Sequence, residues 1–133
     1  MKKVIAIDFD GTCVTHEFPN IGRSIGAEKV LKKLTDKGHN LVLFTMRCDD
    51  SKYGSVLTQA VNWFHENNIP LYGVQTNPTQ KHWTSSPKVY AHLYIDDAAL
   101  GCPLQQELEG EVTDRPFVDW VAVEQMLTDM AFI

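Results

Sequence analysis

The sequence has few cysteines, no long apolar run and fewer basic than acidic residues, and each shortage excludes a class of protein. The three cysteines, at positions 13, 48 and 102, are odd in number and far apart, which argues against a disulfide framework or a zinc site. Residues 4–7 form an apolar run of only four residues, too short for a signal peptide or a membrane span. We therefore expect a cytoplasmic protein with free thiols and no membrane partner.

The balance of charge argues against a nucleic-acid partner. The chain has 12 Lys and Arg against 17 Asp and Glu, a net charge of −5, whereas phosphate backbones attract clustered basic residues. Its composition, 44% hydrophobic and 22% charged, is that of an ordinary globular protein. A length of 133 residues suits one domain, so we expect residues 1–133 to form a single domain.

Apolar periodicity predicts strands that alternate with helices. Near-continuous apolar runs at residues 3–9, 40–45, 71–74 and 91–95 are typical of parallel strands buried on both faces. Helical spacing of apolar residues predicts helices near residues 27–34 and 57–64, and a closing helix after Pro116 or Asp119. Residues 75–87, and 96 to about 115, are expected to be irregular. This order predicts an α/β fold: a three-layer, doubly wound, Rossmann-like parallel sheet with helices on both faces.

Paired carboxylates follow two of the predicted strands. Asp8 and Asp10 follow the first, and Asp96 and Asp97 follow the fourth. Ligands bind beyond the carboxyl ends of parallel strands, so we expect these four side chains to converge. Converging carboxylates repel one another unless a cation compensates them, and an oxygen-only ligand set favours Mg²⁺. The alternative is structural: Asp10 in a turn, and the second pair in a loop or helix cap.

Hydroxyl and basic residues near the strand ends are candidate phosphate contacts. Thr45 follows the second strand, and Arg47 can bind an oxyanion in a bidentate way. Lys88 precedes the fourth strand and can offset charge on a transferring phosphoryl group, with Lys81 or Lys52 as alternatives. Gly11 and Thr12, directly after Asp10, complete this set.

Together these residues resemble the haloacid dehalogenase (HAD) superfamily of aspartate-nucleophile phosphohydrolases. The motifs, in the family's order along residues 4–97, are Asp8-Phe9-Asp10-Gly11-Thr12, Leu43-Phe44-Thr45, Lys88 and Tyr94-Ile95-Asp96-Asp97. The resemblance implies that Asp8 attacks phosphorus to form an aspartyl phosphate and that Asp10 is the general acid and base. It also implies Mg²⁺ bound by Asp8, Asp97 and the Asp10 carbonyl, with Asp96 sharing this task or holding a metal-bound water. Thr45 and Lys88 would bind the phosphoryl oxygens.

The spacing of the motifs leaves no room for the cap domain that many members carry. Residues 12–27 and 75–87 are too few for an independent domain, so the resemblance implies a capless, open site. Open sites in this superfamily imply a phosphorylated macromolecule or a small phosphorylated molecule enclosed by a homo-oligomer. The candidates to line the entrance are His16, Glu17, Phe18, Pro19, His82 and Trp83. Cys13 and Cys48 are interpreted as small buried residues, and the histidines as having no metal-binding role.

The expected function is Mg²⁺-dependent hydrolysis of a phosphomonoester, with three alternatives. A phosphotransferase of the same superfamily uses the same nucleophile. A non-catalytic phospholigand-binding protein would be expected to lack Asp8 or Asp10, and both are present. A receiver-like signalling domain carries its acceptor aspartate after the third strand, where this chain has Gln75, Thr76 and Asn77.

Overall fold

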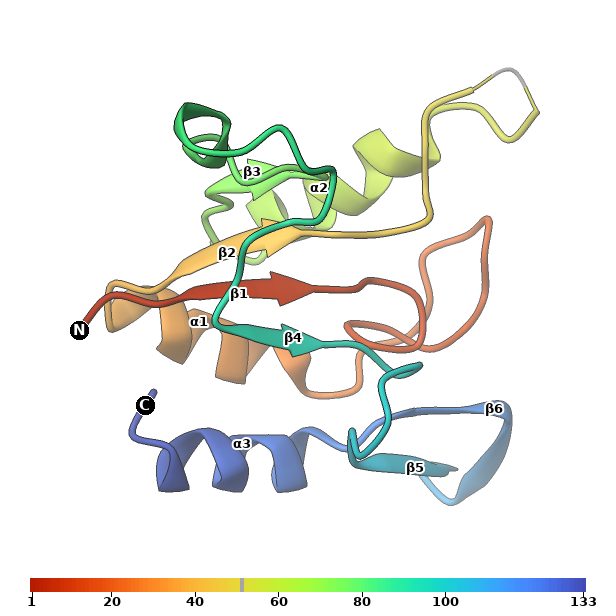
Figure 1. The fold of residues 1–133 in the computed structure, drawn as a ribbon. Coiled ribbons are helices and arrows are strands. Elements are labelled where there is room, and N and C mark those ends of the chain that lie inside the picture. The colour runs from red at the N-terminus through yellow and green to blue at the C-terminus, as the bar shows by residue number, and fades with distance from the viewer. Residues whose placement is uncertain (51) are drawn as a thin grey trace.

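A four-stranded parallel sheet forms the centre of the protein. The computed structural model describes residues 1–50 and 52–133 (Figure 1). The strands are β1 (Val4–Ile7), β2 (Asn40–Leu43), β3 (Gly73–Val74) and β4 (Leu93–Ile95), in the order β3-β2-β1-β4. All four predicted strands are present, each shorter than its apolar run. Because Ile7 pairs with Leu43 on one side and Ile95 on the other, β1, β2 and β4 end at the same level.

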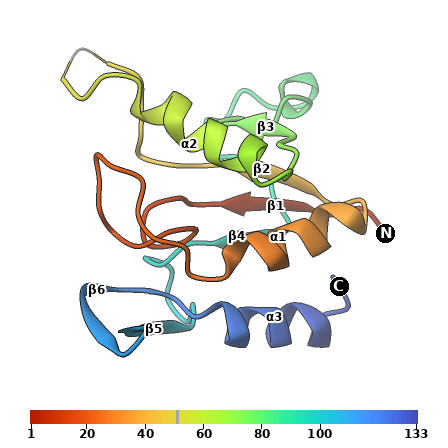
Figure 2. The ribbon, with the colours of Figure 1, turned by 180° about the vertical axis from the view of Figure 1, so that it is seen from behind.

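The two crossover helices lie on the same face of the sheet. α1 (Ala27–Asp36) and α2 (Val56–Glu66) stand behind the sheet in Figure 1 and in front of it in Figure 2. The strand order explains this, since right-handed crossovers that proceed from β1 to β2 to β3 in one direction place both helices on one side. Gly38, with φ of 92°, supplies the left-handed residue that ends α1, as its sequence position predicts.

The closing helix packs into the same core. α3 (Trp120–Asp129) begins after Asp119, whose carboxylate accepts a hydrogen bond from the Ala122 amide as an N-cap. Trp120, Val123 and Leu127 are buried in the cluster that also holds the β1 side chains. The predicted helix is therefore present, and it starts after Asp119, the second of the two predicted positions.

The opposite face of the sheet departs from the prediction of helices on both sides. The connection from β3 to β4 crosses this face and holds the short 3-10 helix η1 (Gln80–His82) in place of an α-helix. Val89 of this connection packs on Ala6 and Val42. Residues 75–87 have too few apolar side chains for an amphipathic helix, so a loop with its own hydrogen bonds covers this face instead.

Residues 96 to about 115, expected to be irregular, contain most of an antiparallel hairpin. β5 (Leu104–Leu108) pairs with β6 (Glu111–Val118), and Glu109 and Gly110 form the two-residue turn with φ of 53° and 83°. Two positive φ values are the mark of a type I′ turn, which normally carries Asn or Asp before Gly. The turn was not predicted, because its first residue is Glu109 and not Asn or Asp. Within the described part of the chain, no helix is both long and apolar enough to cross a membrane.

Candidate functional site

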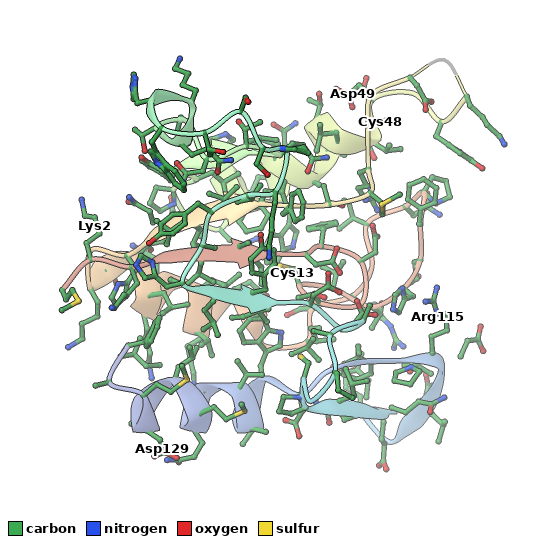
Figure 3. All side chains as sticks on the ribbon, in the orientation of Figure 1. Lys2, Cys13, Cys48, Asp49, Arg115 and Asp129 are labelled. Carbon is green, nitrogen blue, oxygen red and sulfur yellow. The ribbon has the colours of Figure 1, made fainter. Side chains whose placement is uncertain are left out.

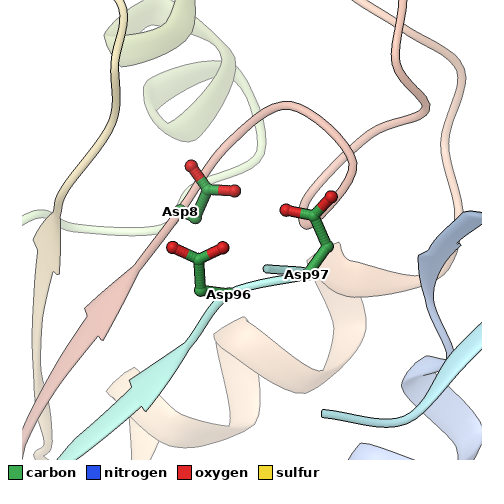
Figure 4. Close-up of side chains that lie close together, drawn as sticks. All are labelled: Asp8, Asp96 and Asp97. Atoms are coloured by element: carbon green, nitrogen blue, oxygen red, sulfur yellow. The ribbon is translucent and has the colours of Figure 1, made fainter. Parts of the chain in front are cut away.

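Three aspartates gather at the carboxyl ends of two neighbouring strands. Asp8 directly follows β1, and Asp96 and Asp97 directly follow β4 (Figure 4). One carboxylate oxygen from each lies within 4.8 Å of the others. Strand order reverses between β1 and β4, since β1 leads to β2 on one side and has β4 on the other. This is the position at which open α/β sheets bind ligands.

The cluster places Asp8 in an unfavourable electrostatic position. Burial, opposed by the hydrogen bond from Thr12 and reinforced by the charge of Asp96, raises the pKa of Asp8 from 3.8 to about 7. The charged form of Asp8 is therefore costly unless a cation approaches the three carboxylates. Oxygen ligands in this number suit Mg²⁺, which binds one or two carboxylates and keeps several waters.

The loop after β1 holds the cluster in place. The Thr12 hydroxyl lies 2.8 Å from Asp8 Oδ2, to which it donates, and accepts a hydrogen bond from the Asp97 amide at 3.0 Å. His16 Nε2 lies 2.8 Å from Asp97 Oδ2. Thr12 is fully buried, and the acceptors of its hydroxyl are Asp8 Oδ2 and, at 3.3 Å, Asp97 Oδ1, so the predicted phosphate contact at Thr12 is wrong in this structure. Thr12 instead positions two members of the cluster.

Gly11 is required by the space around it. Its φ is 76°, and a Cβ at this position would lie 1.9 Å from His16 Nε2 and 2.6 Å from Asp97 Oδ2. Its amide donates to the Val14 carbonyl at 2.8 Å, so the predicted phosphate contact through Gly11 is also wrong in this structure. The glycine instead allows the loop to approach the aspartates closely.

Arg47 has a different role from the predicted one. It is 1% exposed, and its Nε and Nη2 each lie 2.8 Å from an oxygen of Asp10. Its remaining N–H groups donate to the carbonyls of Pro19, Asn20 and Val56. All five guanidinium donors are thereby used, so the prediction that Arg47 binds phosphate is wrong in this structure. Arg47 fixes Asp10 and ties residues 19–20 to the start of α2.

Asp10 is consequently set apart from the other three carboxylates. It lines the same hollow, but its two oxygens face Arg47 and it is not a member of the three-aspartate cluster. Of the four carboxylates expected to converge, three side chains therefore do so, those of Asp8, Asp96 and Asp97, and the cation between them stays a prediction. The Asp10 backbone carbonyl remains a predicted ligand.

Thr45 stands at the end of the second strand with one hydrogen-bonding direction free. Its backbone N–H and C=O are both bound by the side-chain amide of Gln75, and its Oγ1 accepts from the Arg47 amide at 3.1 Å. The hydroxyl hydrogen can still be donated to a ligand in the hollow, which Thr45 lines. Gln75, which adopts a φ of 65°, was not predicted as a site residue, because its partners lie 28 to 30 positions away.

The carboxylates and Thr45 open into a hollow of about 450 Å³, which we call the acidic hollow. Its lining residues are Asp8, Asp10, His16, Phe18, Thr45, Met46, Arg47, Asp96, Asp97, Ala98 and Arg115. His16 and Phe18 line it as predicted for the loop after β1, whereas Glu17, Pro19, His82 and Trp83 do not. Arg115 on β6 was not predicted, because no motif includes it and the hairpin that places it was itself missed.

The predicted motif lysine is exposed and lies outside the lining of the acidic hollow. Lys88 and Lys81 are both exposed, and neither has an ammonium within 4.0 Å of a carboxylate among the described residues. The backbone of Lys88 is held by the Gln80 side chain, which donates to its carbonyl at 2.9 Å. The assignment of Lys88 to phosphate binding therefore stays a prediction.

The three cysteines are free, as expected, but they differ in exposure. Cys13 is fully buried against the Asp8 backbone, and burial raises the pKa of its thiol well above the usual value. Cys48 is exposed, so its predicted burial is wrong: the loop after Arg47 turns outward, and its Sγ lies 3.3 Å from an Asp50 carboxylate oxygen. Neither thiol lines the acidic hollow.

Comparison with known proteins supports the fold. A solved structure described as that of a conserved protein from Bacteroides thetaiotaomicron is similar over 98% of this chain and 93% of that chain, with 29% identity and a TM-score of 0.75. No family model and no curated protein matches the sequence. The fold and the site together define an α/β protein in which three aspartates line an open hollow at the place where the strand order reverses.

Proposed function

We propose that this protein is a Mg²⁺-dependent phosphomonoester hydrolase of the HAD type that acts through an aspartyl phosphate on Asp8. The observation that carries the proposal is the three-aspartate cluster at the β1–β4 switch point, with Thr45 in the same hollow. A single carboxylate after a strand is common, but three carboxylates from two strands in one hollow repel one another, and a bound cation would offset this repulsion.

The donor set fits Mg²⁺. Asp8, Asp96 and Asp97 offer hard oxygen ligands, and the hollow has room for waters and a phosphate group. When bound, Mg²⁺ would offset the negative charge that otherwise keeps a carboxylate and a phosphate dianion apart. Thr12 and His16 orient Asp97 from behind, as the outer partners of metal ligands commonly do.

Asp8 is the nucleophile in this proposal, and Asp10 moves the proton. An Asp8 oxygen attacks phosphorus while the leaving oxygen takes a proton from Asp10, and water activated by Asp10 then hydrolyses the acyl phosphate. Arg47 holds the Asp10 carboxylate in one orientation through two hydrogen bonds. Each Asp10 oxygen retains a second lone pair, so the carboxylate can still accept a proton from water.

Two features favour hydrolysis over the alternatives. The acidic hollow is open, so water can reach an aspartyl phosphate, which disfavours storage of the phosphoryl group for a second acceptor. The carboxyl end of β3 is followed by Gln75, whose amide is committed to the backbone of Thr45 and Arg47. A receiver domain would need its acceptor aspartate at that place.

The decisive experiment tests for hydrolysis and for the covalent intermediate. We expect the full chain to hydrolyse p-nitrophenyl phosphate with Mg²⁺ and to lose activity with EDTA. Asp8→Asn should abolish turnover, and Asp36→Asn, an exposed α1 aspartate outside the hollow, should retain it. Borohydride reduction during turnover should convert Asp8 to homoserine, detectable by mass spectrometry. A folded protein that hydrolyses no phosphomonoester with Mg²⁺ would contradict the proposal.

A further inference from the structure

A second hollow adjoins the acidic one, and both share Arg115. We call it the flap groove, of about 330 Å³, lined by Thr15, His16, Glu17, Arg23, Val112, Thr113, Asp114 and Arg115. His16 and Arg115 also line the acidic hollow, so the two hollows meet between the loop after β1 and the β5–β6 hairpin. Figure 3 shows Arg115 at the end of the molecule where the sheet strands finish, opposite Lys2.

Arg115 differs from the other two arginines of the chain, because within residues 1–50 and 52–133 it has no acidic partner. Arg47 pairs with Asp10, and Arg23 lies 3.9 Å from Glu17 and 3.8 Å from Glu111. Among the described residues no carboxylate comes within 4.0 Å of the Arg115 guanidinium, although Asp114 is its neighbour in sequence. An exposed guanidinium with its donors available, on the wall of a ligand-sized hollow, is suited to bind a carboxylate or phosphate in a bidentate way.

The position of Arg115 relative to the aspartates determines which part of a substrate Arg115 can contact. Asp8 and Thr45 stand at the strand ends, where the proposed function places the phosphoryl group. The rest of the lining includes the exposed Phe18 and Met46, 44% and 97% exposed, together with Arg115. A leaving group that extends from the aspartates along this lining would meet Arg115, whereas the donors of Arg47, the other lining arginine, are already used.

We propose that Arg115 binds a second anionic group on the leaving group of the substrate, and that the preferred substrates are small phosphate monoesters bearing an additional carboxylate or phosphate. This inference rests on the proposed function for the location of the first phosphate. Arg115 is then a specificity-determining residue that binds the substrate at a distance from the reacting bond. Because this contact is equally strong before and during reaction, it lowers KM and leaves kcat unchanged.

A competing explanation is that Arg115 only offsets the negative charge of the aspartates. In that case the removal of Arg115 would change the affinity for the metal, and would change the KM of every phosphate ester by the same factor. Binding of a second anionic group predicts a selective effect, confined to ligands that carry that group. The difference between paired ligands, with and without the second charge, is therefore the informative quantity.

The experiment measures binding and turnover separately, on the full chain with Mg²⁺. Calorimetry compares propylphosphonate with 3-phosphonopropionate and with propane-1,3-bisphosphonate, which add a carboxylate or a second phosphonate and cannot be hydrolysed as esters. We expect wild type to bind one or both doubly anionic ligands about 10- to 100-fold more tightly than propylphosphonate, and Arg115→Gln to lose this preference. The arm that shows the preference identifies the second group as carboxylate or phosphate.

Matched variants and a kinetic comparison complete the test. Arg23→Gln removes a flap-groove arginine already placed beside Glu17 and Glu111, and should retain the preference. Arg115→Lys should retain part of it. For 3-phosphoglycerate, Arg115→Gln should raise KM about 10-fold or more with little change in kcat. For p-nitrophenyl phosphate, which has no second anionic group, the rise in KM should be several-fold smaller.

The outcomes distinguish this inference from the proposed function. Equal binding of singly and doubly anionic phosphonates by wild type, or an equal loss for both in Arg115→Gln, overturns the inference even where phosphate esters are hydrolysed. A preference that depends on Arg115 in a protein that hydrolyses no ester would support Arg115 as the binder of a second anionic group and would contradict both the hydrolase and the assignment of that group to a leaving group.

Discussion

The Asp8→Asn variant is expected to be more stable than the wild-type protein when divalent cations are absent. Asparagine has nearly the same shape as aspartate, and its side-chain oxygen can accept the Thr12 hydrogen bond that Asp8 accepts at 2.8 Å. The substitution removes one negative charge from a group whose three ligand oxygens lie within 4.8 Å of one another. Asp8, the proposed nucleophile, is thus predicted to destabilise the metal-free fold.

The magnitude follows from the pKa of Asp8. Burial, with the charge of Asp96 reinforcing it, raises this pKa from 3.8 to about 7, and each pKa unit corresponds to about 1.4 kcal/mol. The folded state therefore holds the Asp8 proton more tightly than the unfolded chain. This contribution to stability is complete below pH 3.8 and is lost as the pH rises to about 7. The full loss is on the order of 4 kcal/mol, and counter-ions and relaxation reduce the expected change to about 1–3 kcal/mol.

Thermal unfolding in EDTA at pH 5 and pH 8 measures this effect. At pH 8 the Asp8→Asn protein should unfold about 3–15 °C above wild type, since 1 kcal/mol shifts Tm by about 3–5 °C in a domain of this size. At pH 5 the difference should shrink. Excess Mg²⁺ should raise the Tm of wild type and narrow or reverse the gap, because binding to the native state adds stability.

The Asp36→Asn protein serves as the control, since Asp36 is exposed and lies outside the acidic hollow. Its Tm should stay near that of wild type at both pH values. An Asp8→Asn protein less stable than wild type at pH 8 in EDTA would refute the electrostatic reasoning.

Three further substitutions test the supports of the site. Arg47→Met leaves the Asp10 carboxylate and three backbone carbonyls without their donors. It should lower the free energy of unfolding, measured in urea, by about 3–5 kcal/mol. A decrease below about 1 kcal/mol would show that these hydrogen bonds contribute little. Gly11→Ala should destabilise the fold and weaken Mg²⁺ binding in calorimetry, since the new Cβ would overlap His16. The control is Gly101→Ala, because Gly101 has a φ of 89° and open space around it. This control should lose stability and retain Mg²⁺ affinity. Thr12→Val removes the hydroxyl that orients Asp8 and Asp97 and should weaken Mg²⁺ binding about 10-fold, and unchanged affinity would contradict that positioning role.

The sequence predicted the residues at the strand ends well, because strand geometry alone decides where they lie. Asp8, Asp96 and Asp97 follow apolar runs, and parallel strands with a common direction bring their carboxyl ends to one edge. Thr45 was located for the same reason. These predictions needed only local patterns and the rule that neighbouring parallel strands finish together.

Residues whose role depends on distant backbone partners could not be assigned from sequence. Arg47 was expected to face a ligand, yet three of its acceptors are carbonyls of Pro19, Asn20 and Val56, and a carbonyl has no sequence signature. The hairpin escaped for a different reason, since its two-residue turn is formed by Glu109 and Gly110 instead of Asn-Gly. Arg115 was missed with it.

Basic side chains neutralise the carboxylates of the site unequally, and this difference affects the chemistry that each carboxylate can perform. Asp10 receives two hydrogen bonds from a buried guanidinium, whereas no Lys or Arg pairs with Asp8, Asp96 or Asp97 among the described residues. An arginine among the three clustered charges would relieve the repulsion between them. In the proposed function, the placement of Arg47 on Asp10 leaves the cluster free to attract an external cation and holds the Asp10 carboxylate apart from that cation. The same separation would let Asp10 exchange protons with water while Asp8, Asp96 and Asp97 bind the proposed Mg²⁺.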